Sequence, residues 1–392
     1  MKARPEARLR QYRLLTAGEP APWFTLRCGD NPRYNFDTAA GRYLVLGFFG
    51  TAGDDHGRRM IALVNRLRDL FDDDRASFFG VSLDPGDERR LKDSLPGVRF
   101  FWDFGGEACR LYGALPIDAF AGEVSLLRQW VVLDPDLRIR AVLPSRPDGG
   151  DHRELAGLLE ALPPIDHYPG LDVQAPILTL RDVFEPELCR RLVEMHRAGA
   201  PTESGVMTMV NGRTVGRINH QHKSRQDVTI DDPDLRAELQ RRVVRRVFPE
   251  LRKVCQFEVT RMERYIVACY DAEAGGHFGP HRDNTTGGTA HRRFAMSVNL
   301  NADYEGGEIC FPEYGTGSFK MPPGGAVVFS CSLLHAVTPM TRGRRYVFLP
   351  FFYDESAAAL RERNNDLLGD QVEPYQTALE GQADPDAGAP GV

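Results

Sequence analysis

Hydrophobic positions divide the chain into two stretches that follow different periods. In the first stretch, apolar runs at residues 43–49 and 77–83 flank an amphipathic segment at 58–71, in which large apolar residues recur at helical spacing. Further strand-like runs follow at 99–102, 129–133 and 139–143. A strand, a helix and a second strand, followed by a hairpin, predict an α/β domain.

The second stretch is a series of short runs rich in β-branched and aromatic residues, separated by Gly-Gly and Pro-Gly turn signals. These runs lie at 258–270, 293–300, 307–312, 325–331 and 345–353. They predict the antiparallel strands of a double-stranded β-helix, or jelly roll. Residues 182–196, with Leu188, Leu192 and Met195 at helical spacing, predict a flanking helix.

A Pro/Gly-rich joint separates the two stretches. It consists of a polar loop at 144–152, a short predicted helix at 153–162 and an extended segment at 163–176. We therefore expect a first domain with its linker, a second domain and a C-terminal tail, at residues 1–165, 171–355 and 356–392. The end of the tail, from about residue 382, is small and polar enough to be disordered.

Composition restricts the possible partners and compartment. The chain has 392 residues, with 49 Lys and Arg against 55 Asp and Glu, so its net charge of −6 argues against general nucleic-acid or anionic-membrane binding. No run approaches the roughly 20 apolar residues that span a bilayer. Seven Cys without paired spacing suit a reducing compartment, so we expect a cytoplasmic protein. The Arg-rich run at 241–246 is expected to be the solvated face of an amphipathic helix.

Four residues of the second stretch are candidates for chemistry: His281, Asp283, His335 and Arg345. Two imidazoles and one carboxylate can occupy one face of a metal octahedron and leave three positions open, the arrangement of non-haem Fe(II) oxygenases. A guanidinium ten residues after the second histidine can pair with a carboxylate in a bidentate way. Each of these residues alone is weak evidence for a metal site, so the assignment depends on the motifs that surround them.

The surrounding motifs are HRDNTT, RRFAMSVNLN, YEGGEICFPEYG, PPGGAVVFSCS and TRGRRYVF. Together they resemble the Fe(II)/2-oxoglutarate-dependent dioxygenases, specifically the prolyl 4-hydroxylase-like branch, over residues 175–354. The resemblance implies Fe(II) held by His281, Asp283 and His335, with 2-oxoglutarate and O2 as cosubstrates and ascorbate as a candidate reductant. It implies hydroxylation of an amino-acid residue, prolyl-like, in a peptide, protein or small metabolite, while desaturation and ring closure stay open.

The resemblance also implies residues that bind the cosubstrate. The far carboxylate of 2-oxoglutarate needs a cation, and the family spacing assigns that role to Arg345. Arg344 and Arg342 are close in sequence, but strand alternation points Arg344 to the opposite face. Tyr270 stands where the family often has a tyrosine that hydrogen-bonds 2-oxoglutarate, and Tyr265 competes for that role.

Residues 206–228 are a candidate lid. They combine Gly, Asn, His and Arg with few core residues, and the family often closes such a segment over the substrate. The alternative is an ordinary exposed loop. If the segment is a lid, we expect Arg217 or Arg225 to contact an acidic or carbonyl-bearing part of the substrate.

The first domain contains the motifs GEPAPWFTL, VLGFFGTAGDD, FFGVSLDP and RQWVVLDPDLRIRAVLP. Over residues 15–145 these resemble the peroxiredoxin branch of the thioredoxin-like fold. Active members need a thiolate at the start of the first helix, but the corresponding positions here are Asp54 in one alignment and Gly53 and His56 in the other. We therefore expect a redox-inactive domain, retained for stability, substrate presentation or partner binding.

Two classes of function remain open. The first is an enzyme, a 2-oxoglutarate-dependent dioxygenase that acts on a small molecule or on a peptide or protein, without nucleic-acid or membrane partners. The second is a partner-binding or O2-sensing protein that uses a thioredoxin-like interaction module. The complete set of metal and cosubstrate residues favours the enzyme.

Overall fold

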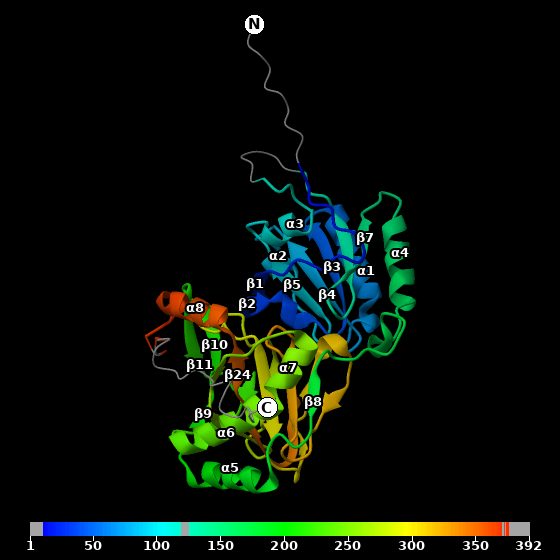
Figure 1. The fold of residues 1–392 in the computed structure, drawn as a ribbon. Helices are drawn as coiled ribbons and strands as arrows, with labels where there is room; N and C mark the ends of the chain where they lie inside the picture. Colours follow the sequence, from blue (N-terminus) through cyan, green and yellow to red (C-terminus); the bar gives the residue numbers. More distant parts are fainter. Residues whose placement is uncertain (1–10, 119–124, 371, 373, 376–392) are drawn as a thin grey trace. The chain divides into compact units, whose positions relative to one another are not determined.

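The computed structural model describes residues 11–118, 125–370, 372 and 374–375. The chain divides into two compact units, one of Met1–Ala175 with Pro312–Thr316 and the other of Pro176–Phe311 with Gly317–Val392 (Figure 1). None of the helices in the described ranges combines the length and apolar character that a membrane crossing requires.

The first unit contains a seven-stranded mixed sheet in the order β2-β1-β5-β4-β3-β6-β7. Its strands are β1 (Thr25–Cys28), β2 (Asn31–Asn35), β3 (Tyr43–Gly50), β4 (Ala76–Ser82), β5 (Val98–Trp102), β6 (Gln129–Leu133) and β7 (Ile139–Pro144). Strands β3, β4 and β5 are parallel, and antiparallel hairpins extend both edges of the sheet. The apolar runs predict β3 to β7, but the short and more exposed β1 and β2 lack such runs.

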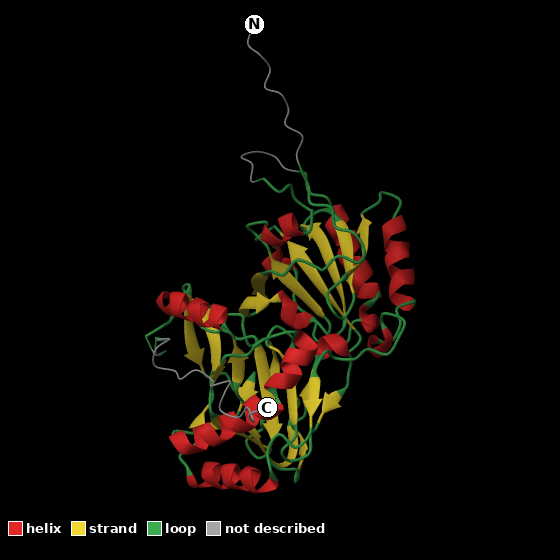
Figure 2. Cartoon of the chain, viewed as in Figure 1, coloured by secondary structure: helices red, strands yellow, loops and turns green. Residues whose placement is uncertain are grey.

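Helices cover this sheet. They are α1 (Asp55–Arg66), α2 (Asp87–Arg90), α3 (Glu107–Leu111) and α4 (Gly150–Glu160), with 3-10 turns at Phe36–Ala39, Arg68–Leu70 and Ile165–His167. Met60 and Val64 of α1 share one core cluster with Leu155 and Leu159 of α4. A separate aromatic group that includes Phe48 forms around Tyr112, which follows α3, so both faces of the sheet are buried, as expected for parallel strands (Figure 2).

Besides a two-stranded hairpin, the second unit contains two larger antiparallel sheets, which form the predicted jelly roll (Figure 2). The minor sheet is β12 (Lys223–Ser224), β16 (His277–His281), β22 (His335–Val337), β19 (Ile309–Cys310) and β20 (Ser318–Phe319). The core of the major sheet is β14 (Arg261–Glu263), β24 (Phe351–Tyr353), β17 (Phe294–Asn299), β23 (Met340–Phe348), β15 (Ile266–Asp271), β13 (Gln226–Thr229) and β9 (Thr202–Glu203). It is completed by β18 (Tyr304–Gly306) on β23, β21 (Ala326–Ser330) on β17 and β8 (Leu178–Leu180) on β21.

Three helices cover one face of the major sheet: α5 (Pro186–Ala198), α6 (Pro233–Arg246) and α7 (Phe248–Cys255). Val267 of β15 and Phe348 of β23 belong to the core cluster beneath them. The alternate residues Ala268, Tyr270 and Val347 form a different cluster, on the face that looks into the jelly roll. Alternation along β15 and β23 therefore decides which side chains enter the interior.

The candidate lid contains regular structure that was not predicted from the sequence. It includes a hairpin of β10 (Val206–Val210) and β11 (Arg213–Arg217), and its closure over a substrate stays a prediction. Asn211 and Gly212 connect the strands with positive φ angles of 49° and 78°. Both angles are required by the tight turn that Asn-Gly favours, so this dipeptide was a hairpin signal.

The expected tail also begins with structure. Residues Glu355–Arg363 form α8, followed by a 3-10 turn at Asn364–Leu367. Arg261 Nε of β14 bonds Glu355 Oε1 at 2.8 Å, which ties α8 to the major sheet. The expected disorder from about residue 382 lies outside the described residues.

Candidate active site

Strand register brings the two candidate metal histidines together. On the neighbouring strands β16 and β22, His281 lies directly opposite His335, and their ring centroids are 4.2 Å apart. The register shifts between Phe278 and His281, which indicates a bulge in β16. Asp283 follows this strand, and its backbone N–H donates to Cys331 O at 2.9 Å. Residues separated by more than 50 positions thus meet at one strand end.

The three side chains converge on one point. Their candidate ligand atoms all lie within 4.8 Å of one another. Asp283 Oδ1 is 3.6 Å from His281 Nε2, and Oδ2 is 3.3 Å from His335 Nε2. The other ring nitrogens donate to backbone carbonyls, His281 Nδ1 to Gly279 O at 2.9 Å and His335 Nδ1 to Leu333 O at 3.0 Å. These bonds fix the tautomer that presents Nε2 to a metal ion, so the donor set fits Fe(II).

Burial and neighbouring charges set the protonation states of His281 and Asp283. Burial and the neighbouring His335 together lower the pKa of His281 to about 4. Burial alone would raise the pKa of Asp283, but His335 and His281 outweigh it and hold that pKa well below its usual value. A neutral imidazole and an ionised carboxylate are the forms that bind a metal ion.

Arg345 is a buried cation inside the jelly roll. It is 2% exposed and lies opposite Tyr270 in the β15–β23 register. Its Nη2 donates to Ser297 Oγ and Asn299 Oδ1, both at 3.0 Å, and its Nε donates to the same Asn299 oxygen at 3.1 Å. Within the described part of the chain, no carboxylate forms an ion pair with Arg345. A buried guanidinium held by neutral groups is costly, so the site favours an anionic ligand.

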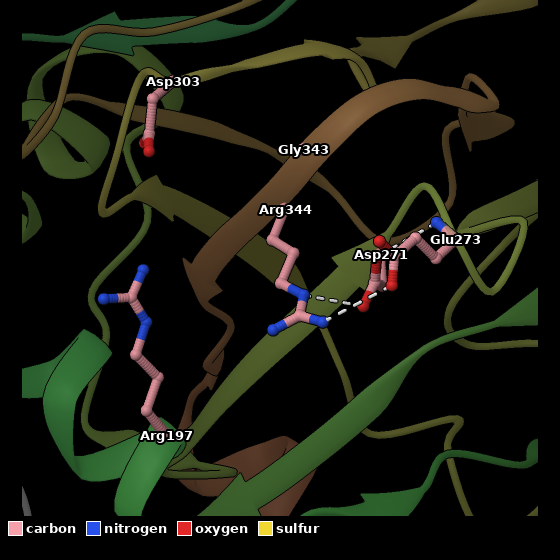
Figure 3. Close-up of a pocket in the computed structure, with 6 residues that line it drawn as sticks. All are labelled: Arg197, Asp271, Glu273, Asp303, Gly343 and Arg344. Atoms are coloured by element: carbon pink, nitrogen blue, oxygen red, sulfur yellow. Dashed lines mark hydrogen bonds and ion pairs between the residues drawn. The ribbon is translucent and has the colours of Figure 1, made fainter.

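The neighbouring Arg344 points the other way, as strand alternation predicts. Its side chain is half exposed and its Nε donates to Asp271 Oδ2 at 2.7 Å. Figure 3 shows it in a surface pocket with Glu273, Arg197 and Asp303. Arg344 is therefore satisfied outside the jelly roll and is not available to a ligand beside Arg345.

Tyr270 rather than Tyr265 faces the same interior as Arg345. The Arg345 guanidinium lies 5.7 Å from the centroid of the Tyr270 ring, and Tyr270 is 2% exposed. Tyr265 packs against Phe348, in the cluster beneath the helices. Of the two candidate tyrosines, only Tyr270 is placed to reach a ligand of Arg345.

The two arginines of the candidate lid lie in different surroundings. Arg217 is exposed at the end of β11, opposite Val206. Arg225 is 7% exposed and clasps Asp227, with Nε 2.8 Å from Oδ1 and Nη2 2.7 Å from Oδ2. A buried ion pair therefore fixes Arg225 next to β13, and contact of Arg217 or Arg225 with substrate stays a prediction.

Several polar groups near the site were not predicted. Ser297 and Asn299 hold Arg345 from β17, and His222 and Lys223 flank His281 on the side of β12. A signal existed for the first pair, because these polar residues alternate with apolar ones within an otherwise apolar strand. No local signal identified Lys223, whose burial depends on pairing with the distant β16.

The first unit has no thiol at the start of α1. Asp54 caps this helix, with Oδ1 accepting from the Gly57 N–H at 2.8 Å, and its other oxygen pairs with Arg128. Partial burial would raise the pKa of Asp54, but these two partners hold it below its usual value. An ionised carboxylate, and not a thiol, thus caps the start of α1.

We expect the full chain to show no thiol peroxidase or disulfide reductase activity. Cys28 and Cys109 are 4% and 0% exposed, and burial raises the pKa of Cys28 to about 12 and that of Cys109 well above its usual value. Neither sulfur therefore ionises at neutral pH. Thiol-dependent consumption of hydrogen peroxide measures this, and a rate that disappears in Cys28→Ser or Cys109→Ser protein would contradict it.

Comparison with known proteins finds similarity in part of the second unit. Residues 265–353 match the model of the 2OG-Fe(II) oxygenase superfamily. A PKHD-type hydroxylase of Cupriavidus metallidurans is 39% identical over 94 residues, which cover 21% of this chain and 40% of the relative. A PKHD-type hydroxylase of Delftia acidovorans is 34% identical over 122 residues, which cover 29% of this chain and 53% of the relative. The chain thus matches about half or less of the length of these relatives.

Solved structures give a weaker likeness. A prolyl hydroxylase of Trichoplax adhaerens, solved with a peptide fragment of hypoxia inducible factor, has 15% identity and a TM-score of 0.36 and covers 47% of this chain and 86% of its own. A prolyl-4-hydroxylase of Pseudomonas putida has 16% identity and a TM-score of 0.33, and the match covers 46% of this chain and 92% of the hydroxylase chain. Residues 265–353 of the second unit are thus similar to the 2OG-Fe(II) oxygenase superfamily, whose members use Fe(II), 2-oxoglutarate and O2, and part of the chain is similar to PKHD-type hydroxylases.

Proposed function

We propose that this chain is an Fe(II)- and 2-oxoglutarate-dependent dioxygenase that hydroxylates an amino-acid residue, prolyl-like, in a peptide, a protein or a small metabolite. One observation carries the proposal: a single jelly roll holds a convergent His281, Asp283 and His335 cluster together with the buried Arg345. A cosubstrate that chelates a metal at one end and carries a carboxylate at the other satisfies both features.

Each protein group has a role that its surroundings support. The Nε2 atoms of His281 and His335 and the carboxylate of Asp283 hold Fe(II). Arg345 binds the far carboxylate of 2-oxoglutarate, and Tyr270 donates its hydroxyl to the same cosubstrate. The apolar cluster of the interior excludes water from these groups. When bound, Fe(II) with 2-oxoglutarate and O2 supplies the oxidation, in which 2-oxoglutarate becomes succinate and CO2 and one oxygen atom enters a substrate C–H bond.

We further propose domain limits and a role for the first unit. Residues 1–165 form a redoxin-like domain without redox activity, which presents substrate, binds a partner or adds stability, and residues 171–355 form the dioxygenase domain. Parallel strands β3 to β5 with an antiparallel edge hairpin, and a capped α1 that lacks a thiol, support this assignment. Seven free cysteines support a reducing compartment such as the cytoplasm.

The test is release of succinate from 2-oxoglutarate by the purified full chain, with Fe(II) and ascorbate. We expect a rate that depends on the metal, is abolished by a chelator and rises with a suitable prolyl-containing substrate. Absence of any metal-dependent succinate would overturn the proposal and favour a partner-binding or O2-sensing protein.

The β10–β11 hairpin leads to a prediction about how tightly the enzyme binds its substrate. We expect Arg217→Ala to raise the substrate KM by about 3- to 10-fold if the hairpin is a lid, because it removes an exposed cation that could pair with an acidic or carbonyl-bearing part of the substrate. Arg213 is a matched control, since it is exposed on the same strand. A KM like that of the wild type in the Arg217 variant would exclude substrate contact by this arginine.

Arg225 calls for a different measurement. We expect Arg225→Ala to lower the free energy of unfolding by about 1.5 to 3 kcal/mol, because it removes the bidentate partner of the buried Asp227 carboxylate and leaves only Arg264 as its cation, at 3.2 Å. Denaturant unfolding of the variant measures this loss. A change below about 0.5 kcal/mol, the range of ordinary surface substitutions, would show that the pair is not structural.

A further inference from the structure

Lys223 is a buried lysine that the proposed mechanism leaves unexplained. It is 4% exposed, and its Nζ donates to Ser204 Oγ and to Gly205 O, both at 2.8 Å. Both acceptors are neutral. An ammonium carries three N–H donors, so these two bonds leave one donor for a ligand.

The surroundings of Lys223 contain more cations than carboxylates. Asp227 already binds Arg225 in a bidentate way, and Arg264 Nη2 lies 3.2 Å from the same carboxylate. No carboxylate of the described chain forms an ion pair with Lys223. Burial, together with Arg225 and Arg264, lowers the pKa of Lys223 to about 5 against the opposing effect of Asp227 and Asp283, and a bound carboxylate would favour the charged form of the amine. A bound anion would offset the cost of burying a charge on Lys223 and would also offset the repulsion of that charge by Arg225 and Arg264.

Lys223 lies beside the candidate metal centre. It pairs with Phe278 across β12 and β16, and its Nζ is 4.7 Å from the centroid of the Phe278 ring. That ring stacks on His281 with a centroid distance of 3.5 Å. One aromatic side chain therefore separates the ammonium from a metal-binding imidazole, a spacing that suits a substrate group next to the reacting carbon.

The anion that Lys223 attracts is distinct from 2-oxoglutarate. The cosubstrate carboxylate has its own cation, Arg345, which Ser297 and Asn299 hold on the major sheet. Tyr270 is near both cationic groups, since Arg345 and Arg225 approach its ring centroid to 5.7 Å and 5.8 Å. Lys223 lies next to Arg225 and not next to Arg345, because Lys223 Nζ and Arg225 Nη2 both donate to Ser204 Oγ.

We propose that Lys223 binds a carboxylate of the primary substrate, so that the enzyme acts on an acidic compound. The source is an acidic residue close to the hydroxylated position of a peptide, or a small carboxylic acid. Because Asp227 occupies Arg225, the site offers one compact cation, which matches a single carboxylate. This inference rests on the proposed dioxygenase function.

The experiment compares substrates that differ only in that carboxylate. Pools of short prolyl-containing peptides with Asp or Glu near the proline are matched with pools that carry Asn or Gln there, and free Asp and Glu are matched with Asn and Gln. Substrate-stimulated succinate release by the full chain gives the ratio of kcat/KM for acid over amide. We expect a ratio above about 10 for the wild type and near 1 for Lys223→Met. The peptide and free-acid arms distinguish the two sources.

Two further variants separate charge recognition from loss of structure. Lys223→Arg keeps the positive charge and should recover part of the preference for acids. Lys253→Met removes an exposed lysine of α7 and should keep the full preference for acids over amides. A purely structural role for Lys223 would lower kcat/KM for acid and amide alike and leave their ratio unchanged.

Two results overturn the inference: a wild-type enzyme that does not prefer acids over amides, or a preference that persists in Lys223→Met. Both are distinct from failure of the proposed function, in which the wild type releases no succinate with or without any substrate.

Discussion

Asp283→Ala protein is expected to lose at least about 100-fold in 2-oxoglutarate-dependent turnover while keeping its fold. Removal of a group that only orients a metal ligand costs 10- to 100-fold in affinity or activity, so loss of the carboxylate ligand itself should cost more. Two neutral imidazoles would hold Fe(II) loosely and would no longer define one face of the octahedron. The backbone bond from Asp283 N to Cys331 O does not involve the side chain and should keep the loop in place.

The measurement combines Fe(II) binding, succinate release and thermal unfolding of the same preparation. Asp231→Ala is a suitable control, because that carboxylate is 85% exposed and touches no group of the site. Hydroxylation that persists in well-folded Asp283→Ala protein would refute the assignment of the three metal ligands.

Strand alternation explains why part of the site could be predicted from sequence. Arg345 lies in a strand whose apolar residues must alternate between two faces, so its inward direction and the outward direction of Arg344 follow from local pattern. The metal-binding residues were predicted from motifs, and the register of β16 and β22 shows how they meet. The central strands of the first sheet were predicted because continuous apolar runs indicate burial on both faces.

The elements that sequence did not predict have local or long-range causes. Strand β16 contains Gly279 and Pro280 and a register shift, which disrupt the usual strand pattern. Its glycine is required, because a Cβ there would lie 2.7 Å from the ring of His222. Lys223 has no sequence signal at all, because its burial follows from a strand pair more than 50 residues apart.

Arg345→Gln is expected to raise the apparent KM for 2-oxoglutarate by about 10- to 100-fold, the effect of losing a charge-assisted hydrogen bond worth about 1.5 to 3 kcal/mol. Glutamine can still contact Ser297 and Asn299, so the pocket keeps a polar lining while its charge is removed. Fe(II) affinity in the absence of 2-oxoglutarate should change little, because Arg345 contacts none of the three metal ligands.

The adjacent Arg344 provides the matched control for this prediction. Arg344→Gln removes the same charge one residue away, but from a half-exposed side chain that pairs with Asp271 on the outer surface. Its apparent KM for 2-oxoglutarate should therefore stay within about twofold of the wild type, because exposed ion pairs contribute little. Since one residue separates the two faces of β23, the reverse result, with a large effect at Arg344 and none at Arg345, would show that the cosubstrate carboxylate lies outside the jelly roll.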